Sequence, residues 1–147
     1  MTDRIESVRE VNAPPERVHD LLVDVEAWAL WSPHIASVTP SSGRVQTGWR
    51  GLVRAWFSPL PTEMVVDRAT AGRGIAWHSR GLGHTLRYEN EVTPWGAGGS
   101  RVRFSARVEG PLGPLVTRVA RPLSAYGQRR RLTRLDALAR LESRRAA

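Results

Sequence analysis

Two stretches of this chain alternate between uncharged and charged side chains, and this alternation constrains the fold more than any other feature. In residues 84–92 and again in residues 101–108, one set of alternate positions is mainly apolar and the other is mainly charged. Successive side chains of a β-strand point to opposite faces, so each stretch predicts a strand with one face against the core. The core-facing positions would be His84, Leu86, Tyr88, Asn90 and Val92, followed by Val102, Phe104, Ala106 and Val108.

Glycine and proline divide the middle of the chain into further strands. In residues 4–11, β-branched residues alternate with polar ones, which predicts a first strand. The two-residue period returns at Ile35. The spacing of the breaks predicts five or six antiparallel strands after Ile35. The breaks fall at residues 40–43, 58–61, 72–74, 81–83 and 94–99.

Apolar residues at three- and four-residue intervals predict two short helices between the first strand and Ile35. Asn12 can accept hydrogen bonds from the free N–H groups of the first helix, and Pro14 and Pro15 fit its first turn. The second short helix should end before Pro33, because the residue before a proline avoids helical geometry.

A long final helix is predicted from Leu115 to about Ser143. Pro122 removes one helical hydrogen bond, so we expect a kink or a break near residues 120–122. The fold class predicted is therefore α+β, with the last helix covering the apolar face of the sheet. We expect residues 1–147 to form a single domain.

The composition excludes several chemistries. All 22 basic residues are arginine, so no lysine can form a Schiff base, and the absence of cysteine excludes disulfides, thiolate metal sites and a cysteine nucleophile. The four histidines lack the spacing of helical zinc motifs, and we expect no metal and no other cofactor. Without a 20-residue apolar run or a secretory signal, we expect a cytoplasmic protein with no membrane span.

The net charge of +8 raises the question of an anionic partner. Most arginines are spread through the predicted strands, which argues against nucleic acid, since phosphate binding needs clustered cations. A cluster occurs only on the final helix, and an acidic carrier protein is one partner that it could contact. The clustered residues are Arg129, Arg130, Arg131, Arg134, Arg140, Arg144 and Arg145.

Several segments together resemble the polyketide cyclase/dehydrase branch of the START-like superfamily, also called Bet v 1-like or SRPBCC. The resemblance rests on residues 11–22 (VNAPPERVHDLL), 24–28 (DVEAW), 31–33 (WSP), 74–80 (GIAWHSR) and 109–115 (EGPLGPL). It implies a helix-grip fold, in which a curved antiparallel sheet of six to seven strands surrounds the long C-terminal helix. It also implies a deep cavity with a mouth near residues 58–61 and 80–83.

The resemblance implies either of two functions for that cavity. The first is a polyketide cyclase/dehydratase-like enzyme (aromatase/cyclase) acting on a polyketide or a related carbonyl compound, and the second is a non-catalytic protein that binds or transports a lipid or another hydrophobic molecule. Cyclisation removes a proton beside a carbonyl, which a base of near-neutral pKa and a cationic or hydrogen-bonding partner would assist, and histidine is the natural candidate for the base. His84 and Tyr88 share the inward face and are the predicted catalytic pair.

Other residues are predicted to bind the ligand, either as aromatic walls or as polar anchors. For each of them, ordinary core packing is the alternative. His34 would face the mouth, whereas His19 and His78 should point outward. The predicted ligand-binding residues are His34, Arg54, Trp56 (or Trp49), Trp77, Asn90, Phe104, Tyr126 and Arg130. The oligomeric state is left open.

Overall fold

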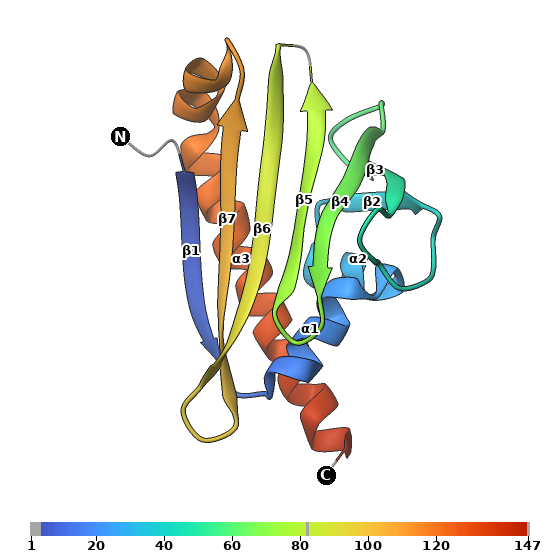
Figure 1. The fold of residues 1–147 in the computed structure, drawn as a ribbon, viewed down its shortest axis with the longest axis vertical. Helices are drawn as coiled ribbons and strands as arrows, with labels where there is room; N and C mark the ends of the chain where they lie inside the picture. Colours follow the sequence, from blue (N-terminus) through green and yellow to red (C-terminus); the bar gives the residue numbers. More distant parts are fainter. Residues whose placement is uncertain (1–3, 82, 147) are drawn as a thin grey trace.

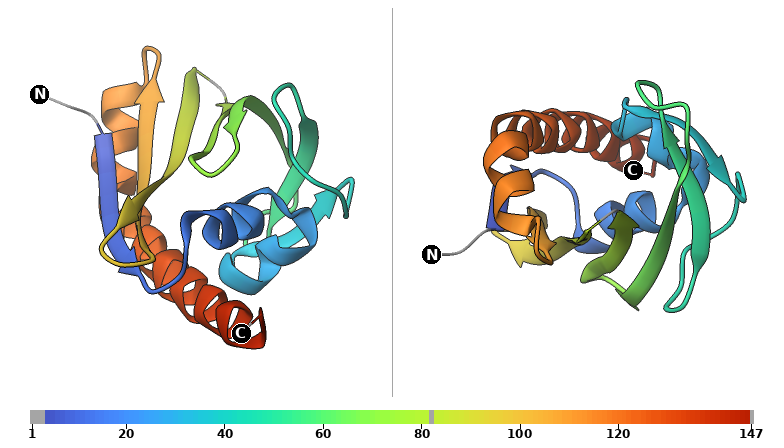
Figure 2. Two further views of the ribbon diagram at one scale, coloured as in Figure 1. Left: turned by 60° about the horizontal axis from the view of Figure 1, so that its bottom comes forward. Right: turned by 90° about the horizontal axis from the view of Figure 1, so that it is seen from above.

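The computed structural model describes residues 4–81 and 83–146, with side chains described as far as residue 141. A seven-stranded antiparallel sheet curves around the long helix α3 (Figures 1 and 2). The elements are β1 (Arg4–Val11), α1 (Pro15–Val23), the 3-10 turn η1 (Val25–Ala27), α2 (Trp28–Trp31), β2 (Ile35–Thr39), β3 (Arg50–Ala55), β4 (Thr62–Thr70), β5 (Gly74–Gly81), β6 (His84–Trp95), β7 (Gly99–Glu109) and α3 (Gly113–Ala146). Leu82, Arg144 and Arg145 were included in the sequence predictions, but Leu82 and the side chains of the two arginines lie outside the described part.

The sheet order is β1-β7-β6-β5-β4-β3-β2, which confirms the predicted fold class. Strands β2 to β7 are meander neighbours, whereas β1 pairs with β7, with Ile5 opposite Ala106. The first two strands of the chain therefore form opposite edges of the sheet. The segment α1-η1-α2 crosses between those edges (Figure 1).

The predicted faces of β6 and β7 are confirmed. Val92, Val102 and Phe104 are almost completely buried, and the alternate positions on the convex face carry ion pairs such as Arg103 with Glu91. Ion pairs between neighbouring strands neutralise the charges on the convex face. That face can therefore be exposed to solvent while the other face packs against the core.

Helix α1 begins later than its sequence suggested. The N-cap is Pro14, whose carbonyl accepts from the N–H of Arg17, so the prediction that Asn12 caps this helix was wrong. The prediction that His19 points outward was also wrong, since only 8% of His19 is exposed. Helix α1 contacts β5, β6 and α3, which leaves it little free surface. Burial lowers the pKa of His19, and its Nδ1 has no hydrogen-bond partner among the described residues.

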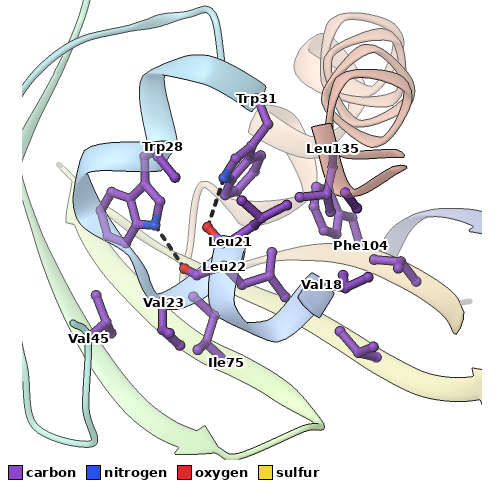
Figure 3. Packing of buried hydrophobic residues seen from close by; sticks show 14 of the residues in the cluster. Val18, Leu21, Leu22, Val23, Trp28, Trp31, Val45, Ile75, Phe104 and Leu135 are labelled. Atoms are coloured by element: carbon purple, nitrogen blue, oxygen red, sulfur yellow. Dashed lines mark hydrogen bonds between the residues drawn. The ribbon is translucent and has the colours of Figure 1, made fainter. Parts of the chain in front are cut away.

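The core lies between α1, α2, α3 and the concave face of the sheet (Figure 3). The indole N–H of Trp28 donates to the carbonyl of Leu22 at 2.8 Å, and that of Trp31 donates to the carbonyl of Leu21 at 3.0 Å. Because each buried indole has found a backbone acceptor, both rings can pack fully into the core without leaving a polar group unpaired. These bonds fix α2 against the end of α1.

Helix α3 remains helical through Pro122, so the proline does not break it. The first turns of the helix nevertheless lie at an angle to the remainder (Figure 2), as expected where a proline removes a backbone hydrogen bond. The rest of α3 is attached to β1 by buried polar contacts. Gln128 donates to the carbonyl of Ile5 at 3.1 Å, and Arg9 pairs with the buried carboxylate of Asp136 at 2.9 Å.

None of the helices in the described residues combines the length and apolar character needed to cross a bilayer.

Candidate functional site

A cavity of about 120 Å³ lies between α2, the concave face of β3 to β6 and helix α3, and it is partly open to solvent. Its wall is mostly apolar, with a few polar groups. The lining residues are Trp28, Trp31, Ser32, His34, Ile35, Val53, Met64, Ile75, Trp77, Tyr88, Asn90 and Arg131. Ligand sites commonly have this composition, in which apolar groups supply contact area and polar groups set orientation.

Two stacked aromatic rings form one side of the cavity. Trp77 on β5 is the register partner of Tyr88 on β6, so both side chains point to the same face. Their ring centroids are 4.1 Å apart and the planes differ by 14°. Each ring is held by the other, so a ligand that contacts them restricts little further side-chain freedom.

Tyr88 and Arg131 place a hydrogen-bond donor and a cation at the cavity. Burial raises the pKa of the Tyr88 phenol, and the nearby charge of Arg131 opposes this by a smaller amount. The phenol therefore keeps its proton at neutral pH and can donate it in a hydrogen bond. Burial lowers the pKa of Arg131, but a guanidinium remains charged in proteins.

Arg131 is held in place by contacts on α3 and β7. Its Nε donates to the carbonyl of Gly127 at 3.3 Å. Its Cζ lies 5.6 Å from the centroid of the Phe104 ring. Phe104 in turn packs against Trp31, with centroids 5.8 Å apart. The guanidinium therefore lies over a buried aromatic ring, and the face of that ring attracts the positive charge.

His34 contributes a neutral imidazole. Burial, and to a smaller extent the charge of Arg131, lowers the pKa of His34 from 6.5 to about 4. Its Nδ1 lies 3.2 Å from the Oγ of Ser32, and the tautomer decides which of the two donates. At neutral pH the ring is therefore uncharged, and one of its two nitrogens carries a lone pair.

Asn90 lies deeper on the same sheet face. Only 6% of Asn90 is exposed, and within the described part of the chain no hydrogen bond involves its side-chain amide. An amide in an apolar wall costs free energy unless it finds a partner. A ligand oxygen or a water in the cavity would satisfy it.

The structure brings together four of the residues predicted from the sequence, namely His34, Trp77, Tyr88 and Asn90. Phe104 lies behind the wall, under Arg131.

Other predicted residues lie outside the lining of the cavity. His84 packs over Gly81 at the end of the sheet. Arg54 donates to the carbonyl of Ser58 at 3.3 Å. Trp56, Tyr126 and Arg130 are exposed to solvent.

Trp49, the alternative to Trp56, packs edge-on against Trp28, with centroids 5.6 Å apart. His78, as predicted, lies on the convex face, where its Nδ1 is 2.8 Å from Asp67.

Arg131 and Ser32 are the polar lining residues that were not predicted from the sequence to face the cavity. Arg131 is the third of three consecutive arginines, and successive helical side chains are turned by about 100°, so only one of the three can point at the sheet. Arg131 follows Gln128 by three residues and precedes Leu135 by four, and both of these lie on the buried side of α3. This helical spacing is the sequence signal that places Arg131 on the same side.

A family model described as "Polyketide cyclase / dehydrase and lipid transport" matches residues 2–142. The chain belongs to this family. No curated protein matches this polyketide cyclase/dehydrase family member by sequence.

Solved structures agree on the fold of this family member. A START superfamily protein from Mycobacterium smegmatis has a TM-score of 0.68 at 18% identity, covering 92% of this chain and 98% of that one. Ara h 8.0201 has a TM-score of 0.71 at 15% identity, covering 92% and 96%. DynU16, titled a putative protein in the dynemicin biosynthetic locus, has a TM-score of 0.71 at 18% identity. The alignment covers 97% of this chain but 48% of DynU16, so the chain spans about half of that protein.

Family and fold together support binding of a hydrophobic ligand. The START/Bet v 1-like architecture predicted from the sequence is thereby confirmed.

Proposed function

We propose that the cavity binds a flat, apolar carbonyl compound, with the carbonyl oxygen directed at Tyr88 and Arg131. The observation that carries this proposal is the presence of a protonated phenol and a guanidinium in one mostly apolar wall. A carbonyl oxygen accepts from both groups, whereas a pure hydrocarbon would leave both unsatisfied. The aromatic rings of Trp77 and Tyr88, which line the same cavity, offer contact area for the ring of such a ligand.

The volume limits how much of a ligand can be enclosed. An engineered protein cavity of roughly 150 Å³ holds one benzene molecule. The cavity of about 120 Å³ therefore encloses about one ring. A larger polyketide would leave its remaining rings at the open side.

The binding test compares two probes of nearly the same shape. Acetophenone carries the carbonyl, and α-methylstyrene replaces its oxygen by a CH₂ group. We expect the wild-type protein to prefer acetophenone about tenfold, as one or two hydrogen bonds would provide. Binding is measured by quenching of tryptophan fluorescence and by chemical shifts of the aromatic protons.

Variants separate the polar groups from general packing. Tyr88→Phe and Arg131→Met should each reduce the preference for the ketone, while binding of α-methylstyrene changes little. Arg130→Met is the matched control, since Arg130 is the exposed neighbour of Arg131. Equal binding of the two probes to the wild-type protein, or an equal effect of Arg130→Met, would contradict the proposal.

A second candidate function is catalysis of the cyclase/dehydratase type. The observation in its favour is that a neutral imidazole, His34, lines the same cavity as Tyr88 and Arg131. The imidazole would take a proton from the carbon beside a carbonyl, and the electron pair of that C–H bond would move to the oxygen, which Arg131 and Tyr88 would hold as an enolate. The enolate carbon would then attack a second carbonyl, and protonation and loss of water would complete the ring.

Proton exchange distinguishes this enzyme from a carrier. An enolising protein should exchange the methyl protons of acetophenone for deuterium in heavy water, followed by NMR, at a rate that falls at least about a hundredfold in His34→Asn. The low pKa of His34 makes it a weak base, so the exchange would be slow but measurable. If acetophenone binds without exchange above the rate of His34→Asn, the protein is a carrier. His84→Ala, outside the lining, serves as the comparison, and it also tests the predicted catalytic role of His84.

A further inference from the structure

The first half of α3 carries a row of large apolar side chains that face solvent. They recur at three- or four-residue intervals, so they form one stripe on the helix. The stripe lies opposite Thr117 and Gln128, which are buried. The members of this apolar row are Leu115, Val119, Leu123 and Tyr126, with Leu112 just before the helix, and Val119 and Leu123 are 72% and 76% exposed.

A second exposed apolar group lies on the loop between β3 and β4. Trp56, Phe57 and Leu60 are all exposed, and the rings of Trp56 and Phe57 meet edge-on at 5.6 Å. This loop, the start of α3 and the turn between β5 and β6 lie at the same end of the molecule (Figure 1). Two segments far apart in sequence thus expose apolar surface at one end, which isolated surface leucines would not do.

Helix α3 carries only positive charges from its start at Gly113 to the residue before Asp136. Residues 110–135 contain six arginines and no aspartate or glutamate. Arg118, Arg121, Arg129, Arg130 and Arg134 are exposed, and no ion pair joins any of them to another described residue. The convex face of the sheet differs, because there arginines pair with carboxylates, as Arg68 does with Glu89.

We propose that this end of the molecule docks on the surface of an anionic lipid bilayer. An amphipathic helix with arginines beside its apolar stripe can lie in the headgroup region, with the stripe among the acyl chains. Exposed Trp56 suits the same interface, since an indole has both an apolar ring and a polar N–H. Docking goes beyond the proposed function, because none of these residues lines the cavity.

Two other partners could cover this end of the molecule, namely a second copy of this chain and an acidic protein, and neither fits as well. A second copy of this chain would place unpaired arginines against unpaired arginines, and residues 110–135 offer no carboxylate to separate them. An acidic protein would match the arginines, but it would not by itself require apolar side chains on two separate segments. A bilayer surface of acidic lipids matches both the unpaired arginines and the exposed apolar side chains.

The experiment is co-sedimentation with vesicles. We expect the wild-type protein to bind vesicles containing about one third phosphatidylglycerol at least about tenfold more tightly than vesicles of phosphatidylcholine alone. The difference should shrink when the ionic strength is raised, because surface charges are screened. Absence of binding to either kind of vesicle, or equal binding to both, overturns the proposal.

Variants test the two components separately. Val119→Asp with Leu123→Asp should weaken binding to anionic vesicles at least about tenfold, and Arg129→Glu with Arg130→Glu should do so by a similar factor. All four side chains are exposed, so folding should be unaffected, as circular dichroism will check. Unchanged binding in both double variants overturns the proposal.

The controls use the same changes elsewhere. Leu30→Asp changes an exposed leucine on α2, and Arg17→Glu with Arg73→Glu reverses two charges on α1 and on the turn between β4 and β5. That turn lies at the opposite end of the molecule from the loop between β3 and β4 (Figure 1). Losses in the controls equal to those in the test variants overturn the proposal.

Two further readouts separate the alternatives. A concentration-dependent dimer that Val119→Asp dissociates, without vesicle binding, would assign this end to a second copy of the chain and overturn the proposal. Retention on an acidic protein without vesicle binding would likewise overturn it. Acetophenone binding should stay the same in the Val119→Asp, Leu123→Asp variant, so failure of docking and failure of the cavity proposal give different results.

Discussion

Acidification should destabilise the protein through His34 in particular. The folded-state pKa of His34 is about 4, whereas its ordinary value is 6.5. Below about pH 6.5 the unfolded chain binds a proton that the folded chain does not, so the free energy of unfolding falls as the pH falls. The loss begins near the ordinary pKa and is complete below about pH 4.

The size of the effect follows from the two pKa values. Their gap corresponds to about 3 kcal/mol, because each factor of ten in proton affinity is worth roughly 1.4 kcal/mol. His34 is only partly buried, and solvent screening reduces this value. Between about pH 7 and about pH 4.5 we therefore expect a loss of about 1.5 to 2 kcal/mol from His34.

The assay compares the wild-type protein with His34→Asn, which cannot titrate in this range. Urea unfolding followed by tryptophan fluorescence at both pH values gives the free energy of unfolding. The wild-type protein should lose about 1.5 to 2 kcal/mol more than the variant. Burial also lowers the pKa of His19, but His19 is present in both proteins and its effect cancels.

An NMR titration of the imidazole protons measures the pKa of His34 directly. In Arg131→Met the pKa should rise but remain below 6.5, because burial is the larger cause and the Arg131 charge the smaller one. Equal losses of stability in both proteins, or a pKa near 6.5, would refute the assignment of a neutral, buried His34.

Four further substitutions test the packing, each by urea unfolding. Phe104→Ala should lower the free energy of unfolding by about 3 to 5 kcal/mol, because this buried ring packs against both Trp31 and Arg131. A loss near 1 kcal/mol would mean that the neighbouring side chains fill the space left by the ring. Gly74→Ala should cost at least about 3 kcal/mol, since Gly74 has φ +120° and an added Cβ would overlap the carbonyl oxygen of Asn90. Gly96→Ala, at φ +61° in open space, should cost only about 1 kcal/mol, so similar losses at the two glycines would contradict the steric argument. Asp136→Asn weakens the pairing of this buried carboxylate with Arg9 and Arg140 and should cost about 2 kcal/mol; an unchanged midpoint would contradict a stabilising role for the carboxylate.

The sheet could be predicted from the sequence because its signal is local. Strand alternation has a period of two, and it places Val92, Val102 and Phe104 on the core face without knowledge of any distant residue. The placement of Trp77 beside Tyr88 also follows from a simple hairpin register.

The cavity could be predicted only in part, because it depends on distances between elements. His84 shares a strand with Tyr88, but the cavity occupies the middle of the sheet and His84 lies at the end of its strand. The choice between Arg130 and Arg131 depends on the rotation of α3, which its packing against β1 and the bend near Pro122 determine together. His19 was misplaced for a similar reason, since α1 is covered on more than one side.

The position of β1 at the edge of the sheet also determines when the protein can fold. Strand β1 is made first during synthesis, yet its partner β7 is the last strand of the chain, and Ile5 must wait for Ala106. Closing a loop of about a hundred residues costs roughly 4 kcal/mol of chain entropy before any pairing energy is gained. The meander β2 to β7 needs only pairing between strands that are neighbours in sequence, whereas the contacts of β1 with β7 and α3 join distant parts of the chain. We therefore expect the pairing of β1 with β7 to be a slow step of folding.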